Sequence, residues 1–157
     1  MPEPIGPEQV ANAILALLQE SFETVEGIYL DRGTSLFETL ETLTAEQVSR
    51  PIVDGGTTIA GHVYHVRFYL QAIRDYMEGK SQPNLDWKQS WVVKTVNEAE
   101  WKDLREKLAD ERDCIVREIT ETVDWNDERR LGGSMGIIAH TAFHLGAIRQ
   151  MRRVILG

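Results

Sequence analysis

The chain is 157 residues long, is 42% hydrophobic and 27% charged, and carries a formal net charge of -8. This length predicts one domain that buries a sizeable core without disulfides or structural metal ions. The acidic balance, with no run of lysine and arginine, argues against nucleic acid and anionic membranes as partners, because both require a basic patch.

The cysteine content and the N-terminal sequence indicate the cellular compartment in which we expect the protein. Cys114 is the only cysteine, which excludes an intrachain disulfide and a thiolate zinc cage. The first ten residues, MPEPIGPEQV, are polar and proline-rich and are not typical of a signal peptide. No apolar stretch approaches the roughly 18 residues of a membrane span. We therefore expect a cytoplasmic protein that does not bind a membrane.

Helical periodicity dominates the first half of the chain, with no convincing strand alternation. The first predicted helix opens at Pro7 and ends near residue 23. Residues 35–43 form a shorter predicted helix, and Thr44 with Gln47 is a capping box for a short turn. A long helix is predicted over residues 58–78, because apolar side chains recur on one face.

The second half predicts two further long helices after an irregular segment. Residues 80–96, which include Trp87 and Trp91, are predicted to be a long crossing loop. The next helix follows a capping signal at Asn97 and ends near residue 121. Ser134 is the predicted N-cap of the last helix. Four long amphipathic helices predict an all-α four-helix bundle in one domain, and the long middle loop permits a crossover.

All four predicted long helices have such a stripe, which in the first comprises Val10, Ile14, Leu17, Leu18 and Phe22; the stripes are predicted to face inward. In the helix over residues 58–78 the stripe comprises Gly61, His62, His65, Phe68, Tyr69, Ala72 and Tyr76. In the following helix it comprises Trp101, Leu104, Leu108, Ile115 and Ile119. In the last helix it comprises Ile137, His140, His144, Ala147, Ile148, Met151 and Ile155. The histidines thus interrupt otherwise apolar faces.

All four histidines lie in two short segments, GHVYHVRFYL and AHTAFHLGAIRQM. His62 and His65 are three residues apart, and His140 and His144 are four apart, so each pair shares one face of its helix. Two such helices side by side would bring the imidazoles together. A cluster of neutral imidazoles suits a divalent first-row transition metal ion.

The pattern alone leaves two explanations of the histidines open. A single buried histidine is more often a core residue with hydrogen-bonded nitrogens, whereas four of four on two inward faces favour a metal. The pair His140 and His144 lacks the acidic residue of a zincin and so does not indicate a metalloprotease. Tyr69 is a candidate proton donor or a packed tyrosine, and Trp87 and Trp91 line a pocket mouth or cover a core edge.

The two histidine segments resemble motifs of the DinB-like family. TIAGHVYHVRFYL is similar to its second-helix motif, a Trp-Ser followed by His-x-x-His-hydrophobic, and AHTAFHLGAI to its fourth-helix motif, commonly His-x-x-His-His-Arg-Gly-Gln. The order of elements and the length also match, so the resemblance covers essentially the whole chain. It implies a four-helix bundle with a histidine-rich divalent metal site that is often dimeric.

The resemblance also implies which residues bind the metal. The matching ligands are His65, His140 and His144, and the ion is Zn²⁺, Ni²⁺ or a similar one. His62 matches a histidine that is frequent in the family but is usually not a ligand. Three neutral ligands leave the ion its full charge and open positions for water or substrate.

The chain departs from the family motif within the fourth-helix segment. Phe143 stands where many members have the first of two adjacent histidines, and Leu145 and Ala147 replace the usual Arg and Gln. Some relatives are transferases or isomerases that use a low-molecular-weight thiol. Because the two polar side chains are missing, we expect altered thiol recognition in this chain.

These observations predict a metal-dependent enzyme that acts on a small-molecule substrate, by thiol-dependent transfer or isomerisation or by hydrolysis. A non-catalytic metal-binding bundle and a metal-free dimeric interaction module are the alternatives. The resemblance implies a homodimer, for which we expect the first and third long helices to form the interface. No catalytic residue is identified, and the residues expected around the ligands or in a pocket are His62, Tyr69, Phe143, Trp87 and Trp91.

Overall fold

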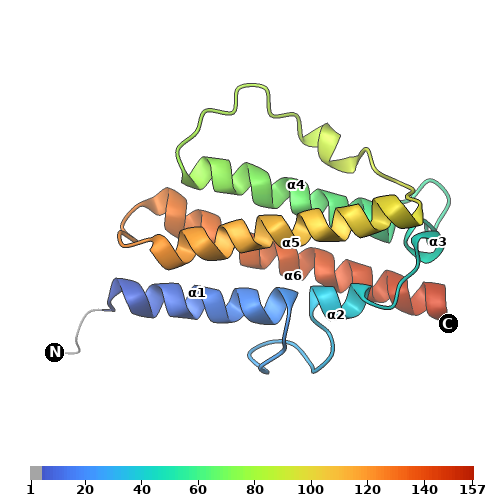
Figure 1. The fold of residues 1–157 in the computed structure, drawn as a ribbon, viewed down its shortest axis with the longest axis horizontal. Helices are drawn as coiled ribbons and strands as arrows, with labels where there is room; N and C mark the ends of the chain where they lie inside the picture. Colours follow the sequence, from blue (N-terminus) through green and yellow to red (C-terminus); the bar gives the residue numbers. More distant parts are fainter. Residues whose placement is uncertain (1–4) are drawn as a thin grey trace.

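The computed structural model describes residues 5–157, and this range is helical without strands (Figure 1). The first four residues of the N-terminal segment that we judged unlike a signal peptide lie outside the described residues. The long helices are α1 (Pro7–Phe22), α4 (Ile59–Met77), α5 (Glu98–Glu121) and α6 (Glu128–Leu156). The short ones are α2 (Leu36–Leu40), α3 (Ala45–Val48) and the 3₁₀ helix η1 (Trp87–Trp91). The all-α prediction is confirmed.

The four long helices pack in a ring. Helix α4 contacts α5 and α6, and α1 contacts the same two helices. Helices α1 and α6 run in one direction and α4 and α5 in the other (Figure 1). The chain therefore has to return along the whole length of α4 before α5 begins, and residues 80–96 form this crossover. The crossover was predicted to be a loop throughout. It instead contains the short helix η1, which packs on α4.

Several helix starts follow directly from local sequence. The side chains of Ser35, Thr44 and Asn97 each accept a hydrogen bond from the backbone N–H three residues later, as a capping box requires. Thr58 caps α4 by accepting from the N–H of Gly61. The capping predictions at Thr44 and Asn97 are confirmed. These caps satisfy backbone donors that the first helical turn leaves free.

The predicted start of the last helix is wrong. Ser134 is not an N-cap but a fully buried residue inside α6, which begins at Glu128 with Asp127 as its cap. The glycines before Ser134 do not break the helix. A Cβ atom on Gly133 would lie 2.5 Å from Cγ of Met77, so this glycine permits the close approach of α6 to α4.

The predicted inward stripe of α5 is confirmed, because all five of its residues are buried. The stripe of α4 is wrong at its last member, since the side chain of Tyr76 is 48% exposed. The neighbouring Met77 fills the core there instead, against the bare face of Gly133. The indole N–H of Trp101 donates to the carbonyl of Leu43 over 2.9 Å, which joins α5 to the segment between α2 and α3.

Glu20 is a fully buried carboxylate that the stripes did not predict. Its two oxygens accept four backbone N–H bonds, from Glu26, Ile28, Tyr29 and Leu30. Burial raises the pKa of Glu20, but the four donors together outweigh it and hold the pKa at about 2. The charged side chain therefore fixes the segment that follows α1.

Helix α6 is the one helix in residues 5–157 that is long and apolar enough to cross a membrane by length and composition. The prediction that no apolar stretch approaches the length of a membrane span is therefore wrong for this helix. A core helix of a bundle has the same length and composition when it packs on several neighbours. Helix α6 contacts both α1 and α4, and this packing buries part of its apolar surface.

Candidate metal centre

Helices α4 and α6 bring all four histidines together in the interior of the bundle. His65, His140 and His144 each present one ring nitrogen, and these three nitrogens lie within 4.8 Å of one another. His65 and His144 are buried, whereas His140 is partly exposed. No carboxylate or thiol belongs to this group, so among the described residues its donor set is purely imidazole.

Two glycines allow the elements around the histidines to approach closely. A Cβ atom on Gly61 would lie 2.9 Å from the carbonyl oxygen of Val93, so this glycine lets the crossover lie directly on α4. A Cβ atom on Gly136 would lie 3.0 Å from the hydroxyl of Tyr69. Gly136 thereby makes room on α6 for the Tyr69 side chain from α4.

Ser90 in η1 determines which nitrogen of His65 carries the proton. The Ser90 hydroxyl donates to the carbonyl of Trp87 over 2.6 Å, and Oγ lies 2.7 Å from Nδ1 of His65. Since its one proton is used, Ser90 accepts, and His65 Nδ1–H is the donor. Nε2 of His65 then keeps its lone pair, and it lies 3.0 Å from Nε2 of His140.

His62 lies outside the group of three but is hydrogen-bonded to it. Nδ1 of His62 is 2.9 Å from Nδ1 of His144, and Nε2 of His62 is 3.2 Å from Oγ1 of Thr57. The three side chains form a continuous hydrogen-bonded chain from an exposed threonine to a buried imidazole. In each of its links only one of the two atoms can be the donor.

Aromatic side chains cover the cluster. Trp91 stacks on His65 with ring centroids 4.0 Å apart and an interplanar angle of 14°. Tyr69 stacks on His140 at 3.6 Å and 7°. Trp87 lies one layer further out, with its ring centroid 6.0 Å from that of Tyr69.

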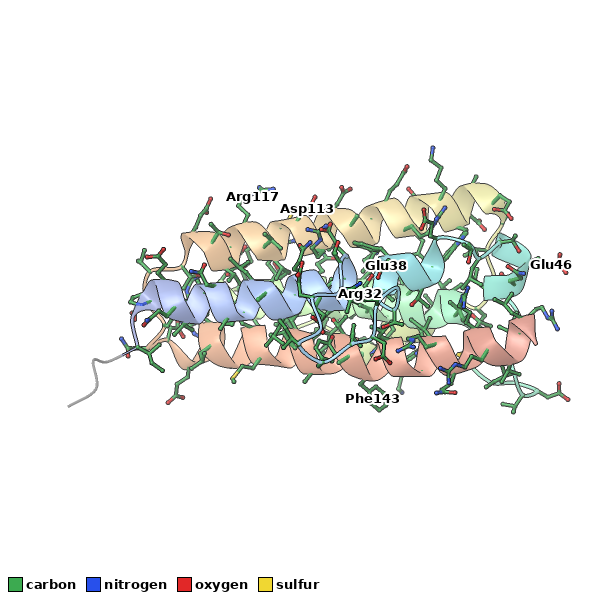
Figure 2. All side chains as sticks on the ribbon, turned by 90° about the horizontal axis from the view of Figure 1, so that it is seen from below. Arg32, Glu38, Glu46, Asp113, Arg117 and Phe143 are labelled. Carbon is green, nitrogen blue, oxygen red and sulfur yellow. The ribbon has the colours of Figure 1, made fainter. Side chains whose placement is uncertain are left out.

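Phe143 lies at the edge of this arrangement. Its side chain is 72% exposed and points away from the bundle (Figure 2). Its ring meets His144 edge-on, with centroids 5.1 Å apart. Phe143 is thus a neighbour of one imidazole on the solvent side and does not line the interior around the three nitrogens.

The environment keeps the imidazoles neutral. Burial lowers the pKa of His62, His65, His140 and His144, and neighbouring imidazoles lower it further for the last three. The pKa falls to about 4 for His140 and to about 3 for His144. Neutral rings have a free lone pair at neutral pH, as metal coordination requires.

The residues present fit a divalent ion. Three neutral imidazoles converge, and hydrogen bonding leaves the lone pair of His65 directed at its neighbour His140. Imidazole suits zinc, nickel and copper, whereas oxygen ligands would be needed for magnesium or calcium. The cluster is therefore compatible with a transition-metal site.

Sequence reasoning missed Ser90 and Thr57, which hydrogen-bond the histidines from outside α4 and α6. A serine within a presumed loop and a threonine beside two glycines give no local signal. Cys114, by contrast, lies on α5 beside Arg74 and Glu118, away from the imidazoles. It has no part in the cluster, in agreement with a packing role.

The sequence profile of the DinB superfamily matches residues 29–148. This range contains α4, the crossover, α5, all four histidines and most of α6. No curated protein and no solved structure matches the chain.

Proposed function

The chain belongs to the DinB superfamily, and we propose that it is a metal-dependent enzyme whose divalent ion is held by His65, His140 and His144. One observation carries the proposal: one ring nitrogen from each of three neutral imidazoles lies within 4.8 Å of the other two. Zn²⁺ and Ni²⁺ are the ions that such a donor set suits best.

A divalent ion in this centre supplies positive charge that acidifies water or a thiol, so that either becomes a nucleophile at neutral pH. Access is from the side of His140, the one partly exposed member of the three. Tyr69 and Trp91 cover the faces of His140 and His65 and keep bulk water from them. Aromatic rings thus stack on two of the three imidazoles, and His140 is the imidazole past which we expect a substrate to arrive.

The surroundings favour a small, uncharged or partly apolar substrate. Trp91 and Tyr69 supply aromatic surface beside the imidazoles, and Trp87 extends it beyond Tyr69. In residues 5–157 no arginine or lysine is hydrogen-bonded to any of the four histidines. Leu145, at the position of the family's arginine, is buried in the core. This supports altered thiol recognition, with water or a low-molecular-weight thiol as the nucleophile.

A non-catalytic metal site is the second candidate function, and the burial of His65 and His144 favours it. The two functions differ in one property. A catalytic site keeps a coordination position open, whereas a structural site is closed by protein ligands. Three ligands with a partly exposed His140 support the catalytic proposal.

Cobalt-substituted protein distinguishes the two. We expect the visible spectrum of bound Co²⁺ to change when azide or a low-molecular-weight thiol is added. A panel of electrophiles, assayed with water alone and with thiols, should show turnover in metal-loaded protein and none in metal-stripped protein or in His140→Ala. A cobalt spectrum that no ligand perturbs, together with no turnover, contradicts the enzyme and favours the non-catalytic site.

A further inference from the structure

His62 is buried to the same degree as His65, with 8% of its surface exposed, yet it lies outside the group of three histidines. A polar side chain at such a place costs stability unless its nitrogens are hydrogen-bonded. Both nitrogens of His62 have a partner, Thr57 on one side and His144 on the other. Its burial is therefore compensated by a specific connection to one of the imidazoles.

The chain Thr57–His62–His144 has two arrangements of its protons. In the first, His144 Nδ1–H donates to His62 Nδ1, and His62 Nε2–H donates to Thr57 Oγ1. In the second, the threonine hydroxyl donates to His62 Nε2, and His62 Nδ1–H donates to His144 Nδ1. Both use the same distances of 2.9 and 3.2 Å.

Only the first arrangement leaves His144 able to bind an ion while the chain is intact. There Nδ1 carries the proton, so Nε2 keeps its lone pair. In the second arrangement the neutral ring carries its proton on Nε2 and has no lone pair to offer there. Nδ1 is itself engaged by His62. The direction of the hydrogen bond between the two histidines thus decides whether His144 can be a ligand.

We infer that His62 is a positioning residue, which accepts the Nδ1–H of His144 and thereby holds Nε2 of His144 ready for the metal ion. The inference rests on the proposed function, because it assigns His62 a role only relative to that ion. It parallels the role of Ser90, which accepts from Nδ1 of His65. Acceptors of this kind fix the ring orientation of metal-binding histidines and raise their basicity.

Comparison of His62→Leu with the control Tyr64→Leu separates the effect of the His62–His144 hydrogen bond from that of losing a ring on α4. Both replace a ring on the same part of α4 by leucine, but Tyr64 is two residues further along the helix and lines a separate pocket with Val96 and Leu104. We expect His62→Leu to weaken Zn²⁺ affinity about 10- to 100-fold and Tyr64→Leu to change it by no more than about twofold. His62→Gln retains an acceptor oxygen and should recover most of the loss. It also serves if His62→Leu does not fold.

Imidazole ¹⁵N NMR of the wild-type protein gives a readout that packing alone does not move. With Zn²⁺ bound, we expect protons on Nδ1 of His144 and on Nε2 of His62, and none on Nδ1 of His62. A proton on Nδ1 of His62, coordination of either of its nitrogens, or equal Zn²⁺ affinity in the two leucine variants overturns the inference. Failure of the wild type to bind Zn²⁺ instead overturns the proposed function, so the two failures are distinct.

Discussion

Ser90 accepts a hydrogen bond from His65 over 2.7 Å and in turn donates to the carbonyl of Trp87. This contact connects the crossover to the histidine cluster and fixes the proton of His65 on Nδ1. The crossover is therefore part of the centre and not only a connection between α4 and α5. Its 3₁₀ helix carries Ser90 and Trp91, both of which contact His65.

Replacing Ser90 by alanine removes the acceptor for His65 and leaves a buried N–H without a partner. We expect Zn²⁺ affinity to fall about tenfold, because such acceptors orient metal-binding histidines. Competition against a chromophoric chelator measures the effect. Ser81→Ala changes an exposed serine of the same crossover and is the matched control. Equal affinities in the two variants would contradict the role of Ser90.

Two adjacent glycines of α6 should respond oppositely to alanine. Gly133→Ala places a Cβ atom 2.5 Å from Met77, and we expect a loss of about 1–3 kcal/mol in the free energy of unfolding. Gly132 has no atom within 4 Å of its Cβ position, so Gly132→Ala should stabilise the helix by up to about 1 kcal/mol. Urea denaturation measures both. A neutral Gly133→Ala would contradict the close packing of α4 and α6.

Glu20 should make stability depend on acid pH. Its pKa is about 2 in the folded chain against 4.5 as the ordinary value, so its contribution is present above pH 4.5 and is lost as the pH falls towards 2. We expect Glu20→Gln to lower the melting temperature at pH 7, with a difference from wild type that shrinks below pH 4.5. Glu121→Gln, exposed at the end of α5, is the control. A difference that stays constant from pH 7 to pH 2 would contradict the charged state of Glu20.

The family resemblance leads us to propose a homodimer, and the structure offers a surface for it. An apolar groove lies between α1 and α6, lined by residues that include Val10, Leu17, Met135 and Ile138. The expected interface helices were α1 and α5; this groove instead pairs α1 with α6, and the expectation for α5 stays a prediction. Light scattering should give twice the chain mass at micromolar concentration, and Met135→Glu should give a monomer, with Val123→Glu as an exposed apolar control. A monomeric wild type would contradict the proposal.

Local sequence rules predicted much of the fold. Capping at Thr44 and Asn97 and the buried stripe of α5 depend on neighbours within a few residues, and all are confirmed. The predicted start of α6 was wrong because Gly133 is a site of close packing against Met77 of α4. No pattern in the local sequence reveals such a contact between helices. Tyr76 was placed inside for the same reason, since its neighbour Met77 takes the core position.

The histidine cluster could be predicted only in part. Helical spacing shows that the members of each pair share a face, and the structure brings the two pairs together. The partners that fix the protons, Ser90 and Thr57, depend on the path of the crossover and on the loop before α4. Glu20 was missed because its partners are backbone N–H groups, which any sequence supplies.

Zinc binding by tag-free protein tests the central claim most directly. Elemental analysis and competition titration should give about one Zn²⁺ per chain for the wild type. Tight binding should be abolished in each of His65→Ala, His140→Ala and His144→Ala, because each variant leaves an incomplete site. Wild-type affinity no tighter than the millimolar range, or full affinity in any one of the three alanine variants, would contradict a metal centre formed by these residues.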